Sequence, residues 1–205
     1  ITVYWGDNNA STNAGSWDNY ASLGSKGQVA LSHDVSGLSG NKTYYFAFKG
    51  DKMALLDSVY NFVVPFKYES IELVGRGAKG IVRLNGKYGA LDKNGVETIP
   101  PKYEALKMDE YDNQYIVAKL NGKYGHIDNH GNIKTPFMYE RADFFYNGLA
   151  EVRLNGKVGY INIANQMVIR NQFEDGNAFI GSQGVTAAKK NGKWGYIDRE
   201  GKTVI

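Results

Sequence analysis

Alternating apolar and polar positions flank a series of Asn-Gly pairs along the chain. The clearest example surrounds Asn85-Gly86, between Ile81–Leu84 and Lys87–Leu91. Asn-Gly favours a two-residue type I′ turn, because both turn residues need a positive φ. The alternation predicts two antiparallel strands whose side chains point to opposite faces in turn. The predicted cross-strand pairs are Leu84 with Lys87, Arg83 with Tyr88, and Val82 with Gly89.

The same pattern predicts which positions form the core. Val82, Leu84 and Leu91 share one face of the hairpin, which we expect to be buried. Gly89 leaves room on a strand, and we expect a ring from a neighbouring copy to approach it. The position of Leu91 is aliphatic in every copy of the motif, as Leu56, Leu91, Ile127, Ile161 and Ile197.

A second turn and a third strand follow each hairpin. In Asp92-Lys93-Asn94-Gly95 the aspartate can cap its own turn, and the glycine supplies a left-handed conformation. Asn165 replaces this glycine in one copy, which suits the conformation. The next strand, Val96–Ile99, leads to a ring that recurs with the same period. We expect this ring to pack in the core or between repeats; its copies are Tyr68, Tyr103, Tyr139 and Phe173.

These features repeat as one unit. The motif Asn-Gly-Lys-aromatic-Gly occurs at Asn85–Gly89, Asn121–Gly125 and Asn191–Gly195, with Val158 replacing the ring in Asn155–Gly159 and a diverged first copy at Gly50–Ala54. A fixed period of this length indicates an array of one supersecondary unit. We therefore predict an all-β, solenoid-like array of about five three-stranded repeats over residues 47–205, elongated or curved, with the last copy truncated. A closed propeller is the alternative, although its blades usually have four strands.

The repeat resembles a known family. Asn191–Lys202 and the tail Pro100–Glu104 resemble the WG repeat, also called KWG, and the resemblance covers about three quarters of the chain. It implies a β-rich repeat module without known catalytic residues, generally suspected of binding. It also implies a bacterial protein that is extracellular, cell-surface or periplasmic.

The first 46 residues differ in composition, being rich in Asn, Ser and Gly. Strands are predicted at Ile1–Gly6, Val29–Val35 and Thr43–Phe48, and the last of these could end this segment or begin the first repeat. Leu38–Tyr44 resembles the tyrosine corner of a fibronectin type III domain. We expect residues 1–46 to be a partial fibronectin-like β-sandwich module that precedes the array.

Composition narrows the function classes. The 24 basic and 21 acidic residues nearly balance, which argues against a nucleic-acid partner. Cysteine is absent, so thiol chemistry and disulfides are excluded. No apolar run reaches the roughly 18 residues of a membrane helix. The chain begins and ends inside predicted strands, which suggests a fragment of a longer protein.

A basic residue stands two positions before the hairpin asparagine in four copies, opposite a ring in three of them. A cation over a ring contributes about 0.5–1 kcal/mol at an exposed site. As ordinary cross-strand pairs, these residues cover the outer face of each hairpin. As a repeated stripe, they form a candidate binding face for a protein or carbohydrate. This candidate binding face comprises Arg83, Tyr88, Lys119, Tyr124, Arg153, Lys189 and Trp194.

Other chemistry finds little support in the sequence. Asp7, Asn9, Ser11 and Asp18 have the spacing of a calcium loop, but glycine is missing where the loop must turn. The three histidines show no metal-ligand spacing, and His126 is expected to pack or lie on the surface. We therefore expect no catalytic residues, metal or cofactor, and a non-enzymatic binding or scaffold module. The alternatives are a structural spacer, or an accessory region of an enzyme whose catalytic domain lies elsewhere.

Overall fold

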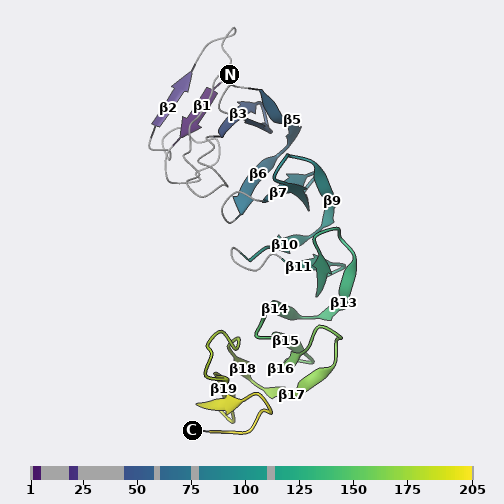
Figure 1. The fold of residues 1–205 in the computed structure, drawn as a ribbon, viewed down its shortest axis with the longest axis vertical. Helices are drawn as coiled ribbons and strands as arrows, with labels where there is room; N and C mark the ends of the chain where they lie inside the picture. Colours follow the sequence, from purple (N-terminus) through teal and green to yellow (C-terminus); the bar gives the residue numbers. More distant parts are fainter. Residues whose placement is uncertain are drawn as a thin grey trace. The chain divides into compact units, whose positions relative to one another are not determined.

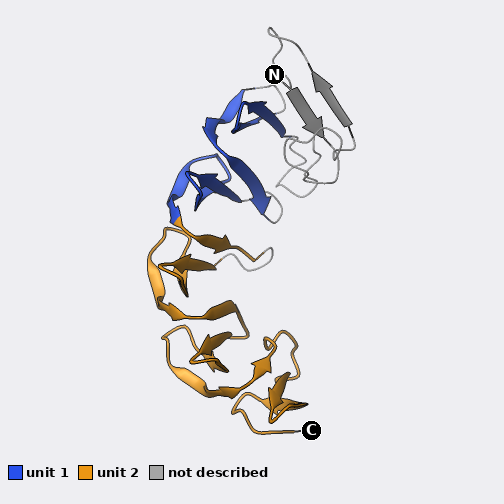
Figure 2. Ribbon diagram, turned by 180° about the vertical axis from the view of Figure 1, so that it is seen from behind, with its two compact units in different colours: residues 1–102 blue, residues 103–205 orange. Residues whose placement is uncertain are grey.

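The computed structural model describes residues 2–5, 19–22, 44–57, 61–74, 79–109 and 114–204. The chain divides into two compact units, residues 1–102 and 103–205, which Figure 2 shows in different colours. All regular structure in the described residues is β-strand, as Figure 1 shows in chain order. The all-β class predicted from the alternating pattern is confirmed.

Twenty strands make up the described structure. β1 (Thr2–Trp5) pairs with β2 (Asn19–Ser22) in a separate antiparallel ribbon. In unit 1 the repeat strands are β3 (Tyr45–Lys49), β4 (Lys52–Leu56), β5 (Phe62–Tyr68), β6 (Ser70–Val74), β7 (Lys79–Leu84), β8 (Lys87–Asp92) and β9 (Glu97–Tyr103). In unit 2 they are β10 (Ala105–Lys107), β11 (Tyr115–Leu120), β12 (Lys123–Asp128), β13 (Ile133–Tyr139), β14 (Arg141–Tyr146), β15 (Leu149–Leu154), β16 (Lys157–Ile161), β17 (Met167–Phe173), β18 (Asp175–Gly176), β19 (Val185–Lys190) and β20 (Lys193–Asp198).

These strands form five small antiparallel sheets, one for each copy of the motif. The sheets are β3-β4-β5, β6-β7-β8-β9, β10-β11-β12-β13, β14-β15-β16-β17 and β18-β19-β20. The three strands predicted for each repeat are present in the first four sheets. In the last sheet, a single bridge from Ile197 to Thr203 marks the place of the third strand. The repeat array is thus confirmed, and the diverged first copy forms a sheet like the others.

A fourth strand, which the sequence did not predict, completes three of the sheets. β6, β10 and β14 each follow the recurring ring of the preceding copy and pair with the first hairpin strand of the next. The first strand of each of these sheets therefore directly follows, along the chain, the last strand of the preceding sheet. The local sequences of these strands share almost no pattern, which is why the period did not reveal them.

The hairpins have the predicted turn and register. Asn85, Asn121, Asn155 and Asn191 all have a φ of 51°, and the glycine after each also has a positive φ. Leu84 pairs with Lys87, Arg83 with Tyr88, and Val82 with Gly89, as predicted.

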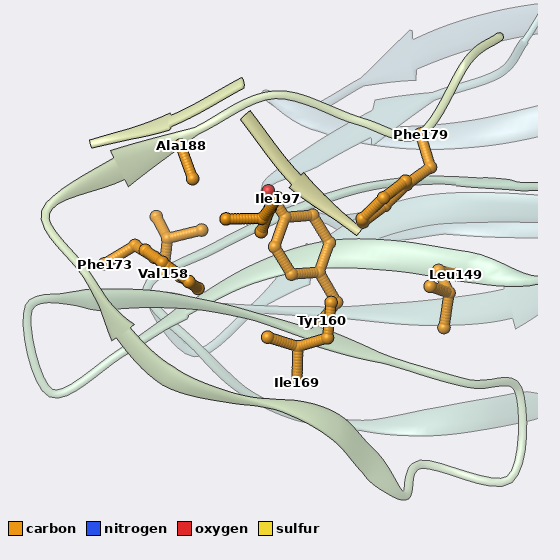
Figure 3. Packing of buried hydrophobic residues seen from close by; sticks show 8 residues of the cluster. All are labelled: Leu149, Val158, Tyr160, Ile169, Phe173, Phe179, Ala188 and Ile197. Atoms are coloured by element: carbon orange, nitrogen blue, oxygen red, sulfur yellow. The ribbon is translucent and has the colours of Figure 1, made fainter. Parts of the chain in front are cut away.

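The predicted core positions are buried, including Val82, except that Leu84 next to the hairpin turn is only partly buried. Leu56, Leu91, Ile127, Ile161 and Ile197 are at most 5% exposed, and so are the rings Tyr68, Tyr103, Tyr139 and Phe173. In sheet β10–β13 both faces are covered, because Ile127 on one face and His126 on the other are each fully buried. Figure 3 shows the cluster that joins sheets β14–β17 and β18–β20 around Tyr160 and Phe179.

Gly89 makes room for backbone and not for the ring that was expected. A Cβ atom at Gly89 would lie 2.5 Å from the carbonyl oxygen of Ile99 and 2.7 Å from the nitrogen of Pro101. At the equivalent Gly159 a Cβ would meet the backbone of β17 at 2.7 Å. The third strand is bulged opposite this glycine in the other repeats where its register is defined. The bulged backbone therefore occupies the space that a side chain would need.

The predictions for the N-terminal segment fall largely outside the described residues. These include the strand Val29–Val35, the calcium-like loop Asp7–Asp18 and all of the tyrosine corner Leu38–Tyr44 except Tyr44 itself. β1 matches the first predicted strand, while β2 was not predicted. β3 begins at Tyr45 and pairs with β4, so the end of the predicted strand Thr43–Phe48 belongs to the first sheet of the array.

Candidate binding face

In unit 1 the candidate binding face consists of Arg83 and Tyr88, side by side on β7 and β8. The guanidinium carbon of Arg83 lies 5.7 Å from the centroid of the Tyr88 ring. The Glu69 carboxylate lies 3.7 Å from Nε of Arg83. The cation therefore has both a ring beneath it and a carboxylate beside it, which lowers the net charge that it offers to a ligand.

In unit 2 Lys119 and Tyr124 repeat this arrangement, with the Lys119 Nζ atom 5.3 Å from the ring centroid. Arg153 differs, because its cross-strand partner is the fully buried Val158. Its guanidinium donates instead to the carbonyl oxygens of Gly156 (3.0 Å) and Glu174 (3.1 Å), and to the Asp175 carboxylate (3.2 Å). Arg153 thus connects its own hairpin to the next repeat and is less available to a ligand than Lys119.

The last sheet carries Lys189 and Trp194 opposite each other on β19 and β20. Trp194 is 54% exposed, the most exposed ring of the candidate binding face. The neighbouring Lys190 lies over Phe173, with Nζ 5.9 Å from its centroid, and also donates to Gln172. All four predicted pairs are present in register, with a ring in three of them.

A recurring glutamate accepts hydrogen bonds from backbone N–H groups of the hairpin turns. This role was not predicted from the sequence. The turn N–H of Gly122 donates to Glu104 at 3.0 Å, and that of Gly156 donates to Glu140 at 3.0 Å. In the first full copy both turn N–H groups donate to Glu69, that of Asn85 at 2.6 Å. The signal was an acidic residue directly after each recurring ring: Glu69, Glu104, Glu140 and Glu174.

The same glutamates also fix the basic residues of the candidate binding face. The backbone N–H of each glutamate donates to the carbonyl oxygen of the basic residue of the next hairpin, at 2.8–2.9 Å. The turn and the basic residue are therefore both tied to the tail of the preceding repeat. We call this arrangement the glutamate clamp; it positions Arg83, Lys119, Arg153 and Lys189.

A charged network in unit 2 lies next to Arg153. Arg141 pairs with the buried Glu151, which is 3% exposed, and also with Asp175 at 3.3 Å. Burial raises the pKa of Glu151, and the pairing with Arg141 works against this rise. Because both arginines share Asp175, the network connects the strands of neighbouring repeats. The pairing of these charges suits a structural role.

His126 is a core residue. Both ring nitrogens have partners, with Nδ1 2.7 Å from Thr135 Oγ1 and Nε2 2.8 Å from the carbonyl oxygen of Asp143. Burial lowers its pKa. Of the two roles expected for His126, packing or a place on the surface, the structure shows packing. Among the described residues, no group of three or more His, Asp or Glu side chains is arranged to hold a metal ion.

The fold and the repeated hairpins define a β-repeat protein built from small sheets in sequence. The model of the WG containing repeat matches residues 61–88, 88–124, 124–157, 159–194 and 194–205. The chain therefore belongs to the WG repeat family. The sheet β3–β5 adds a copy whose hairpin, β3–β4, precedes these matches, with the same bulged register in its third strand.

Among solved structures, the chain is similar to one of a eukaryotic initiation factor, at 12% identity and a TM-score of 0.55. That match covers 80% of this chain and 51% of the initiation factor, so the chain spans about half of its length. Hsv2 of Kluyveromyces lactis is similar at 10% identity and a TM-score of 0.48, over 79% of this chain and 58% of Hsv2. At such identities the similarity to the initiation factor concerns the fold alone.

Two further comparisons gave negative findings. No curated protein matches the chain at a significant level. Within the described part of the chain, no helix has the length and apolar character needed to cross a membrane.

Proposed function

We propose that this chain is a non-catalytic binding module whose candidate binding face holds an extended protein or glycan partner. The observation that supports this best is the repetition of one geometry, a cation over a ring on adjacent strands, at Arg83–Tyr88 and Lys119–Tyr124. Rings and cations present together suit sugar rings and extended peptides. Repetition lets weak contacts add up along a long ligand.

The glutamate clamp supports this proposal, because it fixes each basic residue before a ligand arrives. A preorganised surface loses less conformational entropy on binding. The paired carboxylates also weaken long-range attraction of a purely anionic polymer. The rings should therefore contribute more to affinity than the charges do, and added salt should weaken binding only modestly.

The test is a binding screen against glycan, peptidoglycan and protein ligands. In the first variant Arg83, Lys119 and Lys189 are changed to serine, and in the second Tyr88, Tyr124 and Trp194 are. A matched control changes the exposed Lys93, Lys107 and Arg170, which lie outside the candidate binding face. Arg153→Ser is measured separately, because Arg153 also connects two repeats. Loss of a ligand in the first two variants and not in the control supports the proposal. Retention of every ligand by both folded variants refutes it.

A structural spacer is the second candidate function. It is favoured by the burial of Tyr68, Tyr103, Tyr139 and Phe173, which shows that the recurring rings serve packing. If the parent chain binds nothing in the screen, the spacer function takes precedence. We further propose an exported or cell-surface bacterial setting and a partial fibronectin-like N-terminal module; both rest on resemblance, and fractionation of the native host with the full-length protein tests the first.

A further inference from the structure

Unit 2 contains two junctions between sheets that are built alike but closed by different side chains. At the first, His126 of β12 contacts the carbonyl oxygen of Asp143 on β14 (2.8 Å). At the second, the hydroxyl of Tyr160 on β16 donates to the carbonyl oxygen of Asn177, just after β18 (2.9 Å). His126 and Tyr160 occupy the same position of the repeat, and both are fully buried.

The neighbours of these two side chains also correspond. The His126 ring packs on Phe145 with centroids 4.5 Å apart, and the Tyr160 ring packs on Phe179 at 5.0 Å. On the third strand, His126 faces Thr135 whereas Tyr160 faces Ile169. Figure 3 shows Tyr160 with Ile169 and Phe179 around it. The polar pair at one junction thus replaces an aromatic–aliphatic pair at the other.

The hydrogen bonds around His126 require a neutral ring of one tautomer. A carbonyl oxygen can only accept, so Nε2 must carry the proton that is donated to Asp143. The Thr135 hydroxyl oxygen accepts the backbone N–H of His126 at 3.0 Å. Its own proton is then available to Nδ1, 2.7 Å away. A second ring proton on Nδ1 would leave the Thr135 hydroxyl proton without this acceptor, in a site where both residues are fully buried.

Few charges near the ring offset the cost of protonation. Asp143 of β14 is the acidic group that acts on His126, and it raises the pKa less than burial lowers it. On β13, Lys134 is paired with Asp128 of β12. On β11, the ring of Tyr115 packs against Phe145. On β14, Arg141 is engaged by Glu151.

We propose that the junction between sheets β10–β13 and β14–β17 is a pH-sensitive joint, which opens when His126 takes up a proton, whereas the junction closed by Tyr160 does not respond. The free energy that holds the joint closed is present above the pKa of an exposed histidine, about 6.5. It is lost as the pH falls below this value, because the open state binds the proton more readily than the closed state does. The phenol of Tyr160 has its pKa raised by burial and stays neutral throughout this range.

The test is amide hydrogen exchange at pH 7.5 and pH 5.0, corrected with unstructured peptides for the intrinsic effect of pH. In the parent chain, the exchange of segment 135–146 should accelerate by up to about 30-fold at pH 5.0, the limit for a histidine that stays neutral when closed. Segment 169–180, at the second junction, is the internal control and should change little. Equal acceleration of both segments, or none in segment 135–146, overturns the proposal.

Two variants remove the titrating group. His126→Tyr with Thr135→Ile copies the second junction, and His126→Gln keeps a donor and an acceptor on a side chain that does not titrate. Either variant, once shown to be folded at pH 7.5, should lose the acid-induced opening of segment 135–146. Persistence of that opening in a folded variant assigns it to another group and refutes the role of His126. The exposed His130 changed to Gln is the matched control and should behave as the parent does.

Discussion

Replacing Gly80 with alanine should stabilise unit 1, although glycine is buried there. Gly80 lies in β7, beside a cavity of about 10 Å³. An added Cβ would meet Glu72 O at 3.6 Å, and Leu73 and Leu91 side-chain atoms at 3.8 Å, which are ordinary contact distances. The cavity is also lined by Tyr44, Leu55 and Val64.

Two effects set the magnitude of this gain. Removing glycine from a strand lowers the entropy of the unfolded chain, which contributes about 0.5–1 kcal/mol. Burying one methyl group contributes about 0.8 kcal/mol more. We therefore expect Gly80→Ala to raise the free energy of unfolding by about 1–2 kcal/mol. Ala150 stands at the equivalent position of sheet β14–β17 and is fully buried, so the array already accommodates this side chain once.

Gly89→Ala in the paired strand is the matched control with the opposite sign. Its Cβ would meet Ile99 O at 2.5 Å and the Pro101 ring at 2.9 Å, so backbone must move, at a cost of about 1–3 kcal/mol. The first repeat has Ala54 at this position, where the third strand carries Phe66 in place of Pro101. Urea unfolding followed by tyrosine fluorescence measures both variants. A destabilised Gly80→Ala or an unchanged Gly89→Ala would show that these distances do not govern packing in the sheet.

Three other changes test the core, the glutamate clamp and one ion pair. Ile127→Ala should lower the free energy of unfolding by about 2–5 kcal/mol, because the side chain is fully enclosed; a cost below 1 kcal/mol in urea unfolding would reject the register of β12. Glu140→Gln should cost about 0.5–1 kcal/mol by weakening the exposed bond from the Gly156 N–H, whereas the exposed Glu72→Gln should cost nothing measurable. Hydrogen bonds from Lys67 and Tyr68 lower the pKa of Glu97, so the stability that Glu97 contributes is present above the pKa of an unfolded glutamate and is lost as the pH falls through the lowered value. The difference in melting temperature between the parent and Glu97→Gln should therefore shrink from pH 6 to pH 3, and a constant difference would contradict this.

Local chemistry made the hairpins predictable from sequence. Asn85-Gly86 needs two positive φ angles, and this alone fixes the turn and the pairing of Arg83 with Tyr88. The turn at Asn165 followed from the same reasoning, and its φ is 59°. The aliphatic position of Ile127 was readable because alternation and repetition agreed.

Contacts between repeats were harder to predict, because their partners are distant in sequence. Glu69 binds a turn 16 residues later, and nothing local in its sequence indicates that partner. Gly89 signalled a close approach, but the sequence did not reveal that bulged backbone approaches it. For the candidate binding face, the pairing of Arg153 with Val158 was predicted, whereas its bonds to the next repeat depend on Asp175, which has no counterpart in the other copies.

In each four-stranded sheet, the first strand directly follows the recurring ring of the preceding copy in the sequence. The repeating unit of the sequence therefore does not coincide with one folded sheet. The boundaries between successive family matches fall on the second strand of a hairpin, and a gain or loss of one such length leaves each internal sheet with four strands. Each new copy receives its first strand from its neighbour and provides one in turn. The number of internal sheets can therefore change by whole repeat lengths without altering the strand order within any of them.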